Sequence, residues 1–166
     1  MYSLTIDYQI SVTMKRWCKD SKKHRFKGPA EVFLYIGCYS QGFFVNGVPY
    51  SFDKNLNILY RLKNGNYNSV DGEPSVIHFD KTKEWHKNGS LIVLEHPNGT
   101  KEFYCDGRLH NYKGPAIEYL NGDKEYWIHG MRHRDDGPAV IYGNKKYCFK
   151  DGEFVRELSY FTFFRV

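Results

Sequence analysis

The stretch that decides the fold is Asn121-Gly122-Asp123-Lys124-Glu125-Tyr126-Trp127-Ile128-His129-Gly130. It begins with an Asn-Gly pair, continues through charged and aromatic residues, and closes on glycine. Asn-Gly and Asp-Gly pairs between strand-like runs favour two-residue hairpin turns, because both central positions can need positive φ. The intervening run shows no helical period and is too short for a stable helix. The stretch therefore predicts a β-strand between two turns.

Similar stretches recur along the chain. Residues 98–107 and 143–152 align with residues 121–130, and residues 79–89 align with one altered turn. The closing glycines lie 23 and 22 residues apart, at Gly107, Gly130 and Gly152. A fixed period of this length is the signature of a repeat protein.

A second recurring element is a Gly-Pro step followed by a short apolar run. Its copies start at Gly28-Pro29, Gly114-Pro115 and Gly137-Pro138, and residues 72–77 form a looser copy. Proline cannot donate a ladder hydrogen bond, so it belongs at the first residue of a strand, and glycine accepts the restricted conformation that precedes proline. We therefore expect an all-β fold: an elongated, solenoid-like sheet of about five or six tandem antiparallel β-hairpins.

Such hairpins must stack, because one hairpin alone is only marginally stable in water. The recurring aromatic residues are expected to form a ladder along the sheet, since aromatic cross-strand pairs stabilise it. These residues are Trp85, Tyr104, Trp127 and Tyr147. The residues that define the repeat are Gly28, Pro29, Trp85, Gly107, Gly114, Pro115, Trp127, Gly130, Gly137, Pro138 and Gly152.

Three regions are expected along the chain. Residues 1–20 form an N-terminal capping strand or arm, residues 21–153 form the hairpin repeats, divergent at 36–70, and residues 154–166 form an aromatic tail. Apolar residues alternate from Tyr2 to Met14, which predicts one long half-buried strand. This strand either caps the repeat array or adds to the sheet of another protein. The candidate partner-binding residues are Leu4, Ile6, Tyr8, Ile10, Tyr160, Phe161, Phe163 and Phe164.

Composition narrows the function. Aromatic residues make up 17% of the chain, which favours β-structure. The net charge of +5 comes from interspersed charges of both signs, so there is no specific nucleic-acid signal. The four cysteines form no C-x-x-C pair, which argues against a zinc site. No segment has the length and apolarity of a signal peptide or a transmembrane span, so an intracellular, cytoplasmic location is expected.

The chain resembles the variant MORN-type (membrane occupation and recognition nexus) repeats. The resemblance lies in the succession of a closing Asp-Gly, His-Arg-x-x-Gly-Pro-Ala and Asn-Gly-x-Lys-x-Tyr/Trp, from His24 onward and most clearly over residues 73–152. Similar repeats occur in bacteria, phages and large DNA viruses of the marseillevirus kind. The resemblance implies a hairpin solenoid that acts in scaffolding, docking or assembly, and it implies no catalytic residues. The chain departs from the Tyr-x-Gly-x-Trp start of the classical repeats.

A search for chemistry finds no catalytic, metal or cofactor site. His24, His110 and His133 recur at one point of the unit, so we expect them to cover aromatic rings or bond a turn carbonyl. Asp135 and Asp136 are adjacent on an extended chain and should face opposite ways, as a turn-forming pair. No nucleophile elbow or phosphate-binding loop is present.

Three functions follow as hypotheses. The first is a non-enzymatic structural protein that holds other proteins, capsid or assembly proteins among them. The resemblance extends this to a minor capsid or other virion component. The second is a module that binds carbohydrate or anionic lipid through its aromatic ladder, and such peripheral lipid contact stays open. The third is an accessory protein of a bacterial or phage conflict system.

Overall fold

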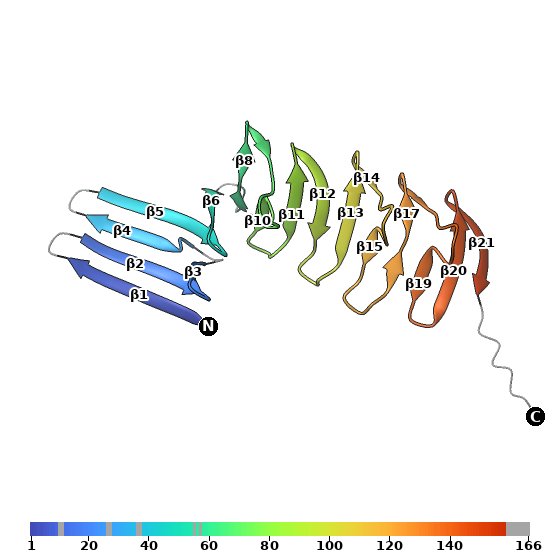
Figure 1. The fold of residues 1–166 in the computed structure, drawn as a ribbon, viewed down its shortest axis with the longest axis horizontal. Helices are drawn as coiled ribbons and strands as arrows, with labels where there is room; N and C mark the ends of the chain where they lie inside the picture. Colours follow the sequence, from blue (N-terminus) through green and yellow to red (C-terminus); the bar gives the residue numbers. More distant parts are fainter. Residues whose placement is uncertain (10–11, 26–27, 36–37, 55, 57, 159–166) are drawn as a thin grey trace, which may run out of the picture. The chain divides into compact units, whose positions relative to one another are not determined.

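The computed structural model describes residues 1–9, 12–25, 28–35, 38–54, 56 and 58–158 (Figure 1). This described part is all β, with twenty-one strands and no helix. It therefore contains no helix that is long and apolar enough to cross a membrane. The chain divides into two compact units, residues 1–81 and 82–166, a division that the repeat pattern did not predict. The predicted all-β class with antiparallel pairing is confirmed.

The first unit is built on four long strands. Strand β2 pairs with β1 on one side and with β4 on the other, and β4 pairs with β5, all antiparallel. Figure 1 shows these four strands side by side. The strands of this unit are β1 (Tyr2–Gln9), β2 (Val12–Lys19), β3 (Lys22–Lys23), β4 (Glu31–Tyr35), β5 (Cys38–Val45), β6 (Val48–Asp53), β7 (Ile58–Tyr60), β8 (Leu62–Lys63), β9 (Asn66–Tyr67) and β10 (Val76–His78).

The N-terminal segment differs from the prediction of one long half-buried strand. The chain reverses between Gln9 and Val12, so the segment forms the hairpin β1–β2. Residues 1–8 are all exposed. The reversal was not visible in the sequence, because the alternation of apolar residues continues through it. Met14 nevertheless pairs with Asp7 and so lies on the opposite face from Leu4 and Ile6.

The core of the first unit lies in its second half. Strands β5, β6, β7 and β10 pair in succession and bury Val45, Tyr50, Leu59 and Ile77. The ring of Phe52 stacks on that of Phe79 with centroids 5.4 Å apart. In the region 36–70, where one or two divergent hairpins were expected, successive strands pair antiparallel as β5–β6, β6–β7 and β8–β9.

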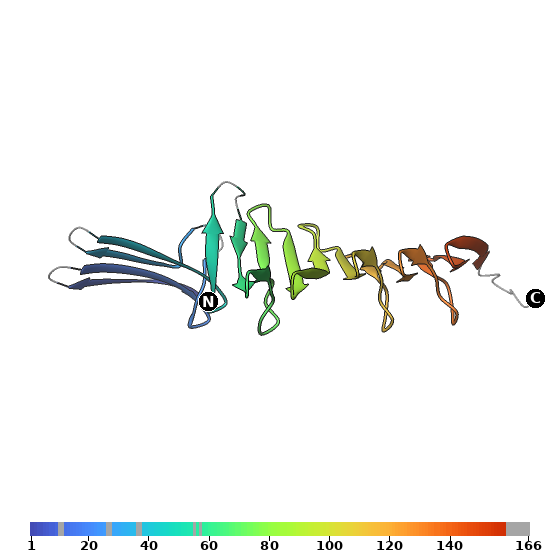
Figure 2. The same cartoon turned by 90° about the horizontal axis from the view of Figure 1, so that it is seen from above.

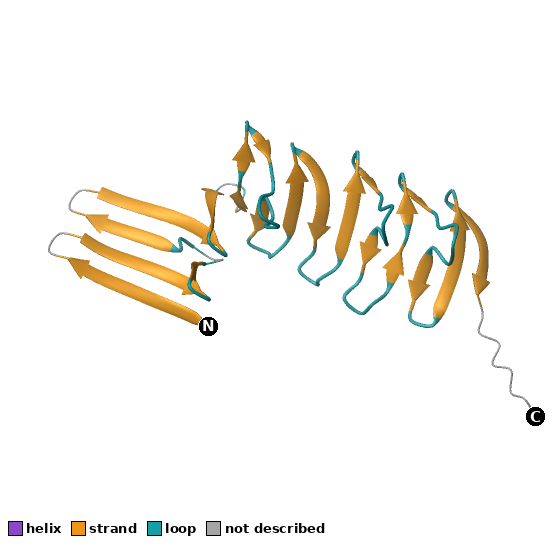
Figure 3. Ribbon diagram, in the orientation of Figure 1, coloured by secondary structure: helices purple, strands orange, loops and turns teal. Residues whose placement is uncertain are grey.

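The second unit is an antiparallel succession of strands, which Figure 3 colours orange. Pairing runs from β11 through β12, β13, β15, β16, β19 and β20 to β21, and the hairpin partner β14 adds to β13. The short hairpin β17–β18 is separate. The strands are β11 (Lys83–Lys87), β12 (Ser90–Glu95), β13 (Lys101–Cys105), β14 (Arg108–Leu109), β15 (Ile117–Glu118), β16 (Lys124–Glu125), β17 (Trp127–Ile128), β18 (Met131–Arg132), β19 (Val140–Tyr142), β20 (Lys145–Lys150) and β21 (Glu153–Leu158).

The closing turns have the predicted chemistry. Gly107, Gly130 and Gly152 lie in two-residue turns, and each glycine and the residue before it have positive φ. The opening turns at Gly99 and Gly122 are different, because only the glycine has positive φ there. In these turns the side-chain oxygen of the preceding asparagine accepts an amide two residues on, from Thr100 and Asp123 respectively.

One backbone contact occurs in both units at the Gly-Pro-Ala steps. The carbonyls of Ala30, Ala116 and Ala139 accept the N–H of the aromatic residue thirteen positions earlier, at 2.7–2.9 Å from Trp17, Phe103 and Tyr126. All three alanines are fully buried, so a larger side chain would have no room. The prolines lie two residues before strands β4, β15 and β19, rather than at the first strand residue as expected. Figure 2 shows these strands and connections from above.

Candidate functional site

The first unit leaves a large apolar surface uncovered. Six side chains form it, each between 38% and 75% exposed: Tyr2, Leu4, Ile6, Tyr8, Leu34 and Tyr39. We call this set the N-terminal apolar face. Strand register places them together, because Tyr8 pairs with Thr13, Thr13 with Leu34, and Leu34 with Tyr39 across four strands. Trp17 pairs with Leu4 and lies on the same face.

The extent of this face sets it apart from ordinary surface apolar residues. A buried aromatic side chain covers roughly 150–250 Å². At 60–75% exposure, its three tyrosines alone leave on the order of 400 Å² accessible. On the same face, strand β2 places Thr13, Lys15 and Lys19 between the apolar residues of β1 and those of β4 and β5. Exposed apolar area of this size on soluble proteins is typical of interaction sites. The geometry therefore fits contact with another macromolecule.

A shallow depression borders this face. It has a volume of about 410 Å³ and is lined by Tyr2, Ser3, Leu4, Trp17, Cys18, His24 and Arg25. The Arg25 guanidinium lies 4.1 Å from the centre of the Trp17 ring, and Lys19 lies 5.7 Å from that of Tyr2. These cation–π contacts place basic groups beside the apolar surface.

Two of the recurring histidines contact aromatic rings, as predicted: His24 lies edge-on to Tyr2 and His110 to Tyr112, with ring centroids 6.0 and 4.1 Å apart. The hydrogen bonds of all three differ from the prediction. His24 Nδ1 accepts the backbone N–H of Asn46 at 3.1 Å, and His110 Nδ1 accepts that of His129 at 3.0 Å. His133 stands in the same relation to Asp151 at 3.2 Å. Each histidine thus caps the amide of a later turn residue with positive φ, whereas we expected a bond to a turn carbonyl. Their recurrence has a structural cause.

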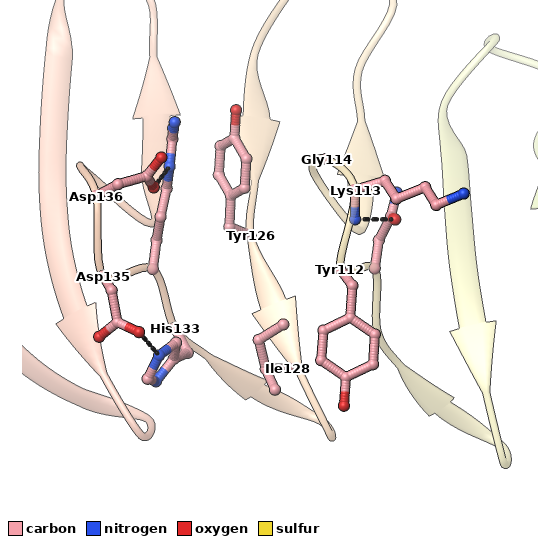
Figure 4. Close-up of a pocket in the computed structure, with 10 residues that line it drawn as sticks. Tyr112, Lys113, Gly114, Tyr126, Ile128, His133, Asp135 and Asp136 are labelled. Carbon is pink, nitrogen blue, oxygen red and sulfur yellow. Dashed lines mark hydrogen bonds and ion pairs between the residues drawn. The ribbon is translucent and has the colours of Figure 1, made fainter.

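A pocket in the second unit collects polar side chains (Figure 4). Its volume is about 460 Å³, and its lining includes Tyr112, Tyr126, His133, Arg134, Asp135 and Asp136. Asp135 lies 3.3 Å from His133 Nε2, whereas Asp136 accepts from Arg134 Nε at 2.8 Å. The two carboxylates therefore have different partners. They lie in a bend, in line with the predicted turn, but both line the same pocket rather than facing opposite ways.

A buried carboxylate organises the opposite side of the second unit. Glu125 is only 2% exposed and accepts hydrogen bonds from Tyr119, Tyr142, Trp127 and Arg132. Burial by itself would raise the pKa of Glu125, but the hydrogen bonds from Tyr142, Tyr119 and Arg132 lower it overall. Among the residues that the structure describes, no group of three or more His, Cys, Asp or Glu side chains is placed to hold a metal ion.

Of the expected aromatic ladder, Tyr104, Trp127 and Tyr147 lie on one face and Trp85 does not. Glu102, Ile117, Glu125, Val140 and Tyr147 pair in succession, and Tyr104 and Trp127 follow Glu102 and Glu125 by two residues. Trp85 pairs with Val93 and Val93 with Phe103, so Trp85 shares the face of Phe103 and lies opposite to Tyr104. The Trp127 ring is half-buried, donates to Glu125 and lies under Arg132 at 5.1 Å. The prediction is therefore wrong for Trp85, because the strand register places Phe103, rather than Tyr104, on the face of Trp85.

The candidate partner-binding residues meet different outcomes. Leu4, Ile6 and Tyr8 lie together on the N-terminal apolar face. Ile10, Tyr160, Phe161, Phe163 and Phe164 lie outside the described residues. Sequence reasoning missed Tyr39, because it treated residues 36–70 only as divergent repeat. It also missed Leu34, because the run from Val32 to Ile36 is continuously apolar and does not show which side chains stay exposed.

The chain matches no protein-family model, and it matches no curated protein significantly.

Proposed function

We propose that this protein is a non-enzymatic scaffold that holds other proteins through its N-terminal apolar face. The observation that carries the proposal is the exposure of six large apolar side chains on one face of strands β1, β4 and β5. Leaving such a surface in water is unfavourable by about 25 cal/mol per Å², so covering it provides the free energy for binding. A flat, open sheet face suits a protein surface better than a small ligand, which prefers an enclosed pocket.

The proposal includes a tandem hairpin array for the rest of the chain. The repeated Ala carbonyl contacts and histidine caps support it, since each repeats with the sequence period. In such an array each hairpin stabilises its neighbours, which makes an extended support for a binding face. A minor capsid or other virion component is the specific form suggested by the resemblance to variant MORN-type repeats.

The ligand-binding alternative has less support. It requires an accessible row of aromatic rings, but Trp127 is held by Glu125 and Arg132, and Trp85 lies on the other face from Tyr104. No observation on the molecule favours the conflict-system hypothesis.

The test is co-purification from the source organism, followed by mass spectrometry, with the wild type and the double variant Leu34→Ser/Tyr39→Ser. We expect the wild type to recover a stoichiometric partner and the double variant to lose most of it. Leu120→Ser is the matched control, since Leu120 is 80% exposed but belongs to the second unit. Equal recovery of the partner by all three proteins would overturn the proposed role of the face.

A further inference from the structure

Strand β1 is an unprotected sheet edge. Among the described residues, β1 pairs with β2 alone, and all eight of its residues pair without a register shift. Natural edge strands carry lysine, proline, a bulge or a covering element that prevents pairing with another chain. Strand β1 has no lysine and no proline, and its only charged residue is Asp7. Its unpaired backbone groups are therefore free to extend the sheet.

The sequence of β1 is complementary to itself in one antiparallel register. If two copies pair about a twofold axis at Thr5, then Tyr2 faces Tyr8 and Leu4 faces Ile6 of the second copy. Ser3 then faces Asp7, and Thr5 faces Thr5. Directly opposed residues in an antiparallel pair share a face, so apolar residues meet apolar residues and polar residues meet polar ones.

Neighbouring registers are worse. After a shift by one residue, Tyr2 of one copy would face Asp7 or Gln9 of the other. The apolar residues of one copy would then lie on the same side of the sheet as the polar residues of the other. A shift by two residues still pairs apolar residues with apolar residues, but it leaves fewer residues of the two strands paired. In the register centred on Thr5 no like charges face each other, because each Asp7 faces a serine.

We propose that a second copy of this chain is the partner of strand β1, which pairs antiparallel with its counterpart about Thr5. The two four-stranded sheets then form one continuous eight-stranded sheet, with both N-terminal apolar faces on the same side. This deepens the proposed function, since it rests on that face as a binding surface and makes the scaffold bivalent. The interface is isologous and closes after two copies.

The test places like charges at the twofold axis without touching the apolar face. Thr5 pairs with Arg16 on the polar face of the sheet. The full-length chain is examined by size-exclusion chromatography with light scattering, from micromolar to submillimolar concentration, as wild type, Thr5→Lys, Thr5→Glu and an equimolar mixture of the two variants. Ser40→Lys is the matched control, because Ser40 is an exposed residue of β5 in the same unit.

We expect a wild-type dimer that dissociates on dilution. Each single variant should weaken dimerisation at least about tenfold, and the mixture should restore it, because lysine then faces glutamate. Ser40→Lys should dimerise like the wild type. Circular dichroism checks the folding of each variant, and if Thr5→Lys fails to fold beside Arg16, Thr5→Glu alone tests the repulsion.

Three results would overturn the proposal: a monomeric wild type at every concentration, undiminished dimerisation of Thr5→Glu, or no recovery in the mixture of two folded variants. None of them affects partner capture by Leu34 and Tyr39, which the variants at Thr5 leave in place. Loss of the dimer and loss of the scaffold function are therefore distinguishable.

Discussion

The Nδ1 atom of His110 accepts the backbone N–H of His129, 3.0 Å away, in the turn between β17 and β18. The two residues are 19 positions apart, so the bond links one hairpin to the next. To accept this hydrogen bond, the Nδ1 atom of His110 must carry no proton. His110 itself is 5% exposed and packs edge-on to Tyr112, with ring centroids 4.1 Å apart.

Replacing His110 should destabilise the second unit. His110→Ala leaves the amide of His129 without its acceptor and removes a buried ring, so we expect a loss of about 1–2 kcal/mol in the free energy of unfolding, measured by urea denaturation. His129→Asn is the control, since it keeps the amide and asparagine tolerates positive φ. Equal losses in both variants would contradict the capping role.

Acid should weaken the same contacts. Burial lowers the pKa of His24 and of His110, the latter also through the neighbouring His129. The unfolded chain therefore takes up protons at higher pH than the folded chain. The contribution of these two histidines to the free energy of unfolding should therefore be complete above a pH of about 6.5. It should decrease as the pH falls below that value. Urea midpoints measured from about pH 7.5 to 5.5 check this, and the double variant His24→Ala/His110→Ala should show a shallower pH dependence than the wild type.

Glu125 should be the most sensitive polar residue of the second unit. Glu125→Ala leaves four donors without an acceptor in a buried site, so the expected loss is about 3–5 kcal/mol. Glu125→Gln keeps the shape and should cost less. Glu118→Gln is the control on the neighbouring strand β15, where a change below about 0.5 kcal/mol is expected. Thermal unfolding that ranks Glu118→Gln with Glu125→Ala would refute the assigned role.

Two glycines at matching repeat positions should respond in opposite ways to alanine. Gly28 has φ of 120°, and an added Cβ would lie 3.4 Å from Arg25, so Gly28→Ala should destabilise the chain by about 1–2 kcal/mol. Gly114 has no such φ, and its nearest neighbour would be 3.7 Å away. Gly114→Ala should therefore be neutral or stabilise by up to about 1 kcal/mol. Denaturation midpoints of the two variants decide whether the difference exists.

Turn positions were predictable because their chemistry is local. The closing pairs before Gly107, Gly130 and Gly152 need positive φ at two successive residues, and the sequence supplies a suitable residue before each glycine. The all-β class follows from the same pattern. The capping role of the histidines was not predictable, because the capped amide lies 18–22 residues away along the chain.

The sequence by itself determined where the chain turns and which residues alternate along each strand, since both depend on a few neighbouring residues. Only the tertiary structure decided that the N-terminal segment reverses into β1–β2 and that its apolar row joins Leu34 and Tyr39. The physical reason is that alternation gives a strand two faces but does not state whether another element covers them. In the described structure the apolar side chains of this face stay exposed, and that exposure makes it the candidate binding surface.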